Sequence, residues 1–401
     1  MNQPTPWQGD PLFERVAIGS LLTRNRIIRA GTAETMADDN GNITPPLVDL
    51  YARLAAKSVG AIITGHMYVT PDGQGAARQV GIHNDDVIGG LRALTAAAHE
   101  HGAAIIAQIS HAGSQSRVPG LDLIGPSAIP NPLTGGMPSE ATPAKISEIV
   151  ESFARAARRA AIAGFDGVHL HGANGYLLSE FASPITNRRS DEWGGSSERR
   201  DAIALTVVAA VKSAVPAEFP LLFKIGLDDA VPGGTMVEES VRRAVRLVGE
   251  GVDAFEVSCG VMGAASDSAP EYVAVDRWRA VRDLIPPRRV ADAPPEGTFR
   301  LASGELKSAV AVPVILTGGV RRVSTMRSLV NAGEADLIGL ARPFVRQPDL
   351  VEAIRSGRLE IVDCTSCNLC LSHSGRDPLR CWRSPRWRLL DHLRRGWSAR
   401  G

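Results

Sequence analysis

Aromatic residues are scarce in this chain, at 5% of 401 residues, and only five residues are cysteines. Acidic and basic side chains nearly cancel, and the formal net charge of +1 provides no field for nucleic acid or an anionic membrane. No apolar run reaches the length that spans a bilayer. The first residues lack the basic start and apolar segment of a secretory signal. We therefore expect a cytoplasmic protein whose cysteines are thiols or ligands rather than disulfides.

Hydrophobic residues make up 44% of the chain, which is typical of a globular protein with a large core. Short apolar runs rich in β-formers alternate with helical patterns, and this alternation produces parallel sheets. Strands are expected at residues 27–31, 61–66, 103–108, 167–170, 221–225, 253–257, 313–316 and 335–340. Helices are expected at about 46–58, 91–101, 146–163, 201–215, 238–251, 298–310, 324–332 and 347–356. Eight of each predict a closed (β/α)8 TIM barrel, rather than an open doubly wound sheet, because no GxGxxG follows the first strand.

Two connections, residues 110–145 and 259–296, are too long for simple turns and follow the third and sixth strands. Both lie at the carboxyl ends of strands, where barrel active sites are built. The segment RVAIGSLLTRNR, before the first strand, alternates and turns like a hairpin that closes the barrel floor. We expect a barrel over residues 1–358 and a short Cys-rich extension over residues 359–401.

The most informative stretch, HGANGYLLSEFASPITNRRSDEWGGSSERR at residues 171–200, follows an apolar strand. His171 and Asn174 offer hydrogen-bond donors for a carbonyl oxygen, and Tyr176 carries a phenol that can give up a proton. The stretch closely resembles the signature of the Old Yellow Enzyme family, the FMN-dependent ene reductases, and the resemblance covers about residues 12–381. It implies that hydride from NAD(P)H reduces the activated C=C bond of a small α,β-unsaturated carbonyl compound, with these three residues as the catalytic set.

The resemblance also implies an FMN site. Gln108 matches the family's glutamine that faces the flavin pyrimidine, and Lys224 stands where the family usually has Arg, which keeps the positive charge beside the reduced ring. Glycines after the seventh and eighth strands let backbone N–H groups approach a phosphate, to which Arg342 adds a bidentate charge. The residues expected to bind the cofactor are Ala30, Gly31, Thr32, Gln108, Lys224, Gly318, Gly319, Gly339, Ala341 and Arg342. Ala33 stands where many members carry Cys or Thr to tune the flavin.

Four other polar side chains near strand ends are interpreted less directly. His169 points to the same face as His171 and is more simply a core histidine, whereas His66, Tyr68 and His111 are candidates for the pocket lining.

Four cysteines, Cys364, Cys367, Cys370 and Cys381, have the spacing C-x2-C-x2-C-x10-C. This spacing suits an iron–sulfur cluster, with zinc as the competitor. The segment resembles the branch of the family that includes 2,4-dienoyl-CoA reductase and trimethylamine dehydrogenase, which hold a [4Fe-4S] cluster here. Since the chain ends 20 residues after Cys381, we expect the cluster to be structural, served by an electron-transfer partner, or absent.

Three functions fit these features. The first is the ene reductase, and the second is a flavin-dependent amine dehydrogenase or N-demethylase. The third is a non-catalytic flavin- or cluster-binding subunit of a larger redox complex. A homo-oligomer or an electron-transfer partner is also compatible with the sequence. The carbonyl-binding pair and the proton donor favour the first, because oxidation of an amine needs neither.

Overall fold

The computed structural model describes residues 9–261, 296–371, 377–385, 387–388 and 390–391. Eight parallel strands close into a barrel, because the first strand pairs with both the second and the last. In barrel order they are β3 Ile27–Arg29, β4 Ala61–Ile63, β6 Ile105–Ser110, β9 Gly167–Gly172, β10 Leu221–Gly226, β11 Ala254–Ser258, β12 Val314–Thr317 and β13 Leu337–Leu340. A short strand, β5 Met67–Tyr68, extends the pairing of β6. The predicted (β/α)8 barrel is confirmed, and every expected strand lies within three residues of its observed bounds.

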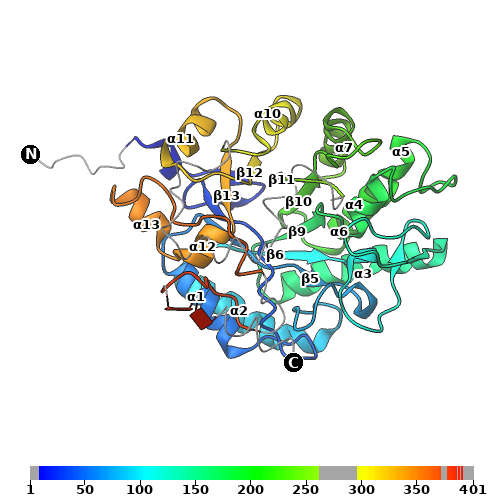
Figure 1. Ribbon diagram of the computed structural model, residues 1–401, viewed down its shortest axis with the longest axis horizontal. Coiled ribbons are helices and arrows are strands. Elements are labelled where there is room, and N and C mark those ends of the chain that lie inside the picture. Colours follow the sequence, from blue (N-terminus) through cyan, green and yellow to red (C-terminus); the bar gives the residue numbers. More distant parts are fainter. Residues whose placement is uncertain (1–8, 262–295, 372–376, 386, 389, 392–401) are drawn as a thin grey trace, which may run out of the picture.

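Helices surround these strands (Figure 1). Those that correspond to the expected helices are α1 Pro45–Ala55, α2 Ile88–His99, α3 Pro143–Ile162, α6 Ala202–Ala214, α7 Val237–Gly249, α10 Arg300–Ala309, α11 Val323–Asn331 and α13 Leu350–Arg355. Three short helices were not expected: α4 Leu177–Ala182, α5 Ser197–Arg200 and α12 Arg342–Arg346. The longest of the described helices, α3, begins where Thr142 accepts the N–H of Lys145 at 3.2 Å and Pro143 occupies the first turn. No helix among the described residues is long and apolar enough to cross a membrane.

The barrel interior consists of an apolar layer below a polar one. The apolar cluster comprises Ile18, Ile28, Ala61, Ile63, Ile106, Leu222, Ala254, Ile315 and Leu337. Ile18 comes from a hairpin of two short strands, β1 Ala17–Ile18 and β2 Leu21–Leu22, so the expected hairpin does close the barrel floor. Because strand side chains alternate, the next inward positions after Ile106, Leu222 and Ala254 are Gln108, Lys224 and Glu256. The polar layer therefore faces the carboxyl ends of the strands.

The long connection after β6 is structured. It contains two short strands, β7 Ile124–Gly125 and β8 Ser139–Glu140, which pair with each other. Glu180 of α4 anchors its beginning by accepting the backbone N–H of Ser114 at 3.1 Å. Burial raises the pKa of the Glu180 carboxyl to about 8. Of the other long connection, residues 262–295 lie outside the described residues.

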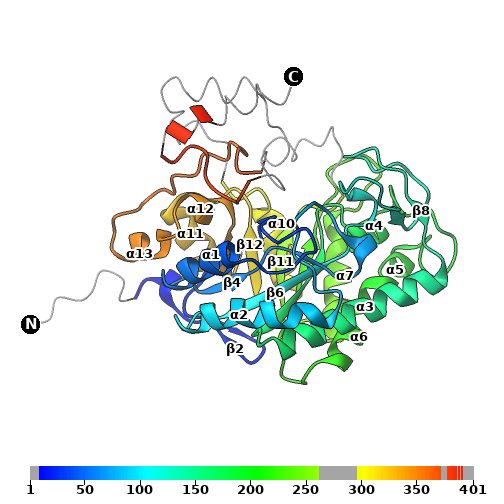
Figure 2. The ribbon, with the colours of Figure 1, turned by 90° about the horizontal axis from the view of Figure 1, so that it is seen from below.

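The segment that carries the cysteines lies on the barrel, at the end opposite to β2 (Figure 2). Its start is attached to the turn between β12 and α11, where the Val362 N–H donates to the Arg321 carbonyl at 3.0 Å. The Arg321 guanidinium donates in turn to the hydroxyl of Ser366 at 2.8 Å. This packing brings residues of the extension to the rim of the barrel.

Candidate active site

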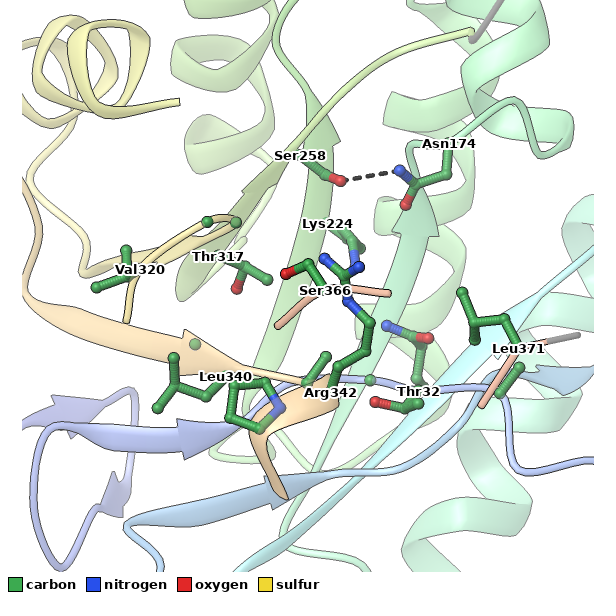
Figure 3. A pocket seen from close by; sticks show the side chains of 18 of the residues that line it. Thr32, Asn174, Lys224, Ser258, Thr317, Val320, Leu340, Arg342, Ser366 and Leu371 are labelled. Atoms are coloured by element: carbon green, nitrogen blue, oxygen red, sulfur yellow. Dashed lines mark hydrogen bonds between the residues drawn. The ribbon is translucent and has the colours of Figure 1, made fainter. Parts of the chain in front are cut away.

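The carboxyl ends of the barrel strands open into a cleft whose empty volume, open solvent included, is about 1160 Å³. The predicted site residues that line it are Gly31, Thr32, Gln108, His171, Asn174, Tyr176, Lys224, Gly318, Gly319, Gly339, Ala341 and Arg342. Figure 3 shows Asn174 and Ser258 at one side and Arg342 extending into the cleft beside Ser366. Of the expected catalytic and cofactor-binding residues, only Ala30 does not line the cleft. It is buried, and its N–H donates to the Leu340 carbonyl at 3.1 Å.

Of the three predicted catalytic residues, His171 lies near the end of β9, and Asn174 and Tyr176 lie on the tight turn that follows it. Asn174 and Gly175 both have positive φ, +59° and +77°, which reverses the chain directly after the strand. A Cβ on Gly175 would lie 2.4 Å from Oε1 of Gln115, so glycine is required here. As a result, the ring of Tyr176 meets that of His171 edge-on, with 4.7 Å between the ring centroids.

Both rings are in protonation states that allow them to donate hydrogen bonds. Burial raises the pKa of Tyr176, so its phenol keeps its proton at neutral pH. Burial, reinforced by the positive charge of Lys224, lowers the pKa of His171 well below its usual value. The imidazole is therefore neutral and has one N–H to offer, and its Nδ1 has no hydrogen-bond partner within the described protein.

Asn174 is held by strand β11. Its Nδ2 lies 2.9 Å from the Ser258 hydroxyl and 3.1 Å from the Cys259 thiol (Figure 3). A hydroxyl and a thiol can each donate as well as accept, so these contacts also permit the opposite carboxamide orientation. In that orientation the NH2 group faces the cleft, as a role in binding a carbonyl requires.

A buried polar chain runs beneath the cleft and joins two predicted cofactor residues. Nε2 of Gln108 lies 2.9 Å from Nδ1 of His169, and Nε2 of His169 lies 3.6 Å from Glu256. The other carboxylate oxygen of Glu256 lies 3.2 Å from the ammonium of Lys224. Burial lowers the pKa of His169 to about 4, so this histidine is neutral. The chain fixes Gln108 and balances the charge of Lys224, so His169 does more than fill the core.

Glycines make room on two sides of the cleft. A Cβ on Gly31 would lie 2.7 Å from both polar atoms of the Gln108 side chain. Gly318 and Gly319, after β12, have φ values of +128° and +70°, which side chains disfavour. Arg342 reaches the cleft from the first turn of α12 and hydrogen-bonds Asn368 of the extension.

This donor set fits FMN. The cleft offers a carboxamide at Gln108 and a cation at Lys224, which can meet the polar edge of the ring, with glycines and Arg342 at the phosphate end. Two buried polar atoms of cleft residues, Nδ1 of His171 and Oγ1 of Thr317, have no hydrogen-bond partner among the residues that the structure describes. Unsatisfied buried polar atoms are costly unless a ligand pairs with them.

Other residues that line the cleft were predicted only as candidates for its lining or were not predicted at all. His66 lines the cleft, as do Ser258 and Thr317 at the ends of β11 and β12. Ser258 and Thr317 could have been predicted because each is a polar residue at the end of a largely apolar strand.

Tyr68 and His111 do not line the cleft. Tyr68 stacks on His83 with 4.9 Å between centroids, and buried His111 accepts the Gly113 N–H at 3.1 Å.

The structure does not show the predicted metal site at the four C-terminal cysteines. Among the residues that the structure describes, no three His, Cys, Asp or Glu side chains are arranged to hold a metal ion. Cys367 packs with Leu369 and Trp382, and Cys381 lies 3.9 Å from the guanidinium of Arg346.

The thiols nevertheless share one electrostatic environment. Burial, followed by the charge of Cys364, raises the pKa of Cys370 to about 12, and Cys367 and Cys381 act in the same direction. Cys364 also lines the cleft. The cysteine segment thus forms part of the wall of the predicted FMN site.

Comparison with known proteins agrees with this geometry. The sequence model of the NADH:flavin oxidoreductase / NADH oxidase family matches residues 11–360. An NADH oxidase of Thermoanaerobacter brockii is 34% identical over 363 residues, covering 89% of this chain and 53% of that protein. An NADPH dehydrogenase of Geobacillus sp. (strain WCH70) is 34% identical over 339 residues, covering 84% and 91%. The chain thus spans about half the length of the first relative and most of the second.

The barrel also matches solved structures. An old yellow enzyme homologue from Zymomonas mobilis superposes with a TM-score of 0.72 at 25% identity, covering 89% of this chain and 95% of that one. Fold, sequence match and site geometry agree, and the chain belongs to the NADH:flavin oxidoreductase / NADH oxidase family, the family of the Old Yellow Enzymes.

Proposed function

We propose that this protein binds FMN and uses hydride from NAD(P)H to reduce the activated C=C bond of an α,β-unsaturated carbonyl compound. The observation that carries the proposal is the convergence of a neutral His171 and a protonated Tyr176 on one wall of the cleft, with their rings 4.7 Å apart. A carbonyl bound by His171 has its neighbouring carbons within reach of the phenol.

FMN, when bound, supplies the two-electron carrier between NAD(P)H and substrate. Gln108 and Lys224 would bind the ring, and Arg342 would bind the phosphate together with the glycines after β12 and Gly339 of β13. His171 and Asn174 donate hydrogen bonds to the carbonyl oxygen, where negative charge collects during the reaction. Tyr176 gives its proton to the carbon beside the carbonyl, and the saturated product leaves.

His171→Ala should weaken binding of a para-substituted phenol by about 10-fold or more, because phenolates accept the same hydrogen bond as the developing oxyanion. Titration of the FMN-loaded protein, followed by the charge-transfer absorption band, measures the affinity. His101→Ala, which removes an exposed histidine, is the control and should bind the phenol normally. Equal affinity in both variants would place the carbonyl elsewhere.

We further propose that the cysteine segment binds a [4Fe-4S] cluster. The C-x2-C-x2-C-x10-C spacing supports this, as do the pKa values of Cys364 and Cys370, which burial raises together with the charges of the neighbouring cysteines. Anaerobically purified protein should contain about four irons and four acid-labile sulfides per chain. Cys367→Ser should lose both while keeping flavin. One metal without sulfide would indicate zinc instead, and metal-free protein would refute the proposal.

A further inference from the structure

Two backbone groups determine the orientation of the Gln79 carboxamide. The N–H of Gly75 donates to its Oε1 at 2.6 Å, and its Nε2 donates to the carbonyl oxygen of His66 at 2.9 Å. A backbone N–H can only donate and a carbonyl can only accept, so the oxygen and nitrogen of this carboxamide are unambiguous. The segment that follows β5 brings the two residues together, because the Tyr68 N–H donates to the Val80 carbonyl at 3.1 Å.

The oriented carboxamide determines where His66 carries its proton. The same Nε2 of Gln79 lies 2.8 Å from Nδ1 of His66, and an NH2 group has only hydrogens to offer. Nδ1 is therefore an acceptor, and the hydroxyl of Ser110 lies 2.9 Å from it. Burial and the positive charge of Lys224 lower the pKa of His66 to about 4. The neutral ring then carries its one proton on Nε2.

That proton faces Tyr176. Nε2 of His66 lies 3.4 Å from the phenol oxygen, and the two ring centroids are 4.9 Å apart. Since Nε2 is protonated, it cannot accept the phenol proton and can only donate to the oxygen. The hydroxyl proton of Tyr176 is consequently directed away from His66.

Several other groups also act on Tyr176. The ring of His171 meets it from β9. Burial raises the pKa of Tyr176, while the charge of Arg117 and a hydrogen bond from Gln115 lower it. Arg117 and Gln115 belong to the connection after β6. The ionisation of the phenol therefore depends on the charge and the hydrogen-bond donors around it as well as on burial.

We propose that His66, locked as the Nε2–H tautomer by Gln79, is a positioning residue that keeps the Tyr176 hydroxyl proton free for the substrate and stabilises the phenolate left behind. The inference rests on the proposed function. In that reaction the Cα–H bond of the product forms as the O–H bond of Tyr176 breaks, and the electron pair of that bond stays on the phenol oxygen. The Nε2–H of His66 then donates to a full negative charge, and a proton from solvent restores the phenol.

The ionisation of Tyr176 tests this directly. The FMN-loaded protein is labelled with [ζ-13C]tyrosine, its four tyrosines are resolved by NMR, and Tyr176→Phe assigns the signal that matters. His66→Phe keeps a ring of similar size but removes the donor to the phenolate. The pKa of Tyr176 should rise by about one unit or more, because the charged form loses a hydrogen bond. Gln79→Met, which unlocks the tautomer, should shift it in the same direction by less.

Stopped-flow kinetics give the second readout. His66→Phe should slow reoxidation by 2-cyclohexenone by about 10- to 100-fold and leave reduction by NADPH unchanged. An unchanged Tyr176 pKa, or equal slowing of both half-reactions, would overturn the inference. If His66→Phe does not fold with FMN, Gln79→Met decides by the same criteria. If Tyr176→Phe is reoxidised at the wild-type rate, the proposed function is refuted. If Tyr176→Phe is reoxidised slowly but His66→Phe is reoxidised at the wild-type rate, this inference alone is refuted.

Discussion

Replacing Tyr176 by Phe is expected to slow reoxidation of the reduced protein by an enone by about 100-fold or more, the usual contribution of one general acid. The change removes a single oxygen atom and leaves the ring contacts with His66 and His171 in place. Reduction by NADPH needs no proton from this residue and should proceed at the wild-type rate. Stopped-flow measurement of the two half-reactions separates these effects.

The pH dependence provides an independent check on the same residue. A proton donor acts only while protonated, and burial raises the pKa of Tyr176. Reoxidation of the wild-type protein should therefore stay level through neutral pH and slow down only at alkaline pH, as the phenol loses its proton. Tyr176→Phe should lack this alkaline decline. A variant that slows both half-reactions equally, or keeps the decline, would rule out the proton-donor role.

Replacing Arg342 by Ala is expected to weaken FMN binding by about 10- to 150-fold, because a hydrogen bond to a charged group contributes about 1.5–3 kcal/mol. Arg342 lines the cleft from the start of α12, as do the glycines that follow β12 and Gly339 of β13. The variant should purify with little flavin, and the flavin that it binds should react normally. Fluorescence titration of the flavin-free protein with FMN measures the affinity.

Arg358→Ala is the matched control, since it removes an equal charge from an exposed position outside the cleft. It should bind FMN like the wild type. If Arg342→Ala also keeps full FMN occupancy after dialysis, the phosphate site has been placed wrongly.

The barrel could be predicted from the sequence because its strands are short, buried apolar runs separated by amphipathic helices. The hydrophobic pattern of each strand and helix can be read from neighbouring residues alone. Eight strand–helix repeats then predict a closed barrel. Helix α4 was missed because its six residues, LLSEFA, are all buried and show no polar face. Helix α12 is five residues long and begins at a residue expected to bind phosphate.

The proximity of the three expected catalytic residues could be predicted because one short stretch contains them. His171 lies near the end of β9, and Asn174 and Tyr176 follow it on the next turn, so their proximity is local. The partners of Lys224 and His66 come from distant segments. Glu256 could have been noticed as a carboxylate within the buried strand AFEVS, but its pairing with Lys224 depends on barrel register.

No sequence pattern indicates a role for Gln79, because its proposed role in fixing the His66 tautomer depends on two backbone contacts that only the fold creates. The cysteines show the reverse case. Their spacing suggests a metal site, but spacing alone does not determine where the thiols lie. Packing of Cys367 against Trp382 and the contact of Cys381 with Arg346 also influence their positions.

The central claim, that the cleft binds FMN and passes hydride from NAD(P)H to an activated C=C bond, is tested most directly by one anaerobic titration. The purified protein is reconstituted with FMN, reduced with one equivalent of NADPH or NADH, and then mixed with 2-cyclohexenone. We predict that the flavin absorption bleaches with the nicotinamide and returns with the enone, with one cyclohexanone formed per flavin reoxidised. Protein that binds no FMN, or reduced flavin that the enone leaves bleached, would contradict the account.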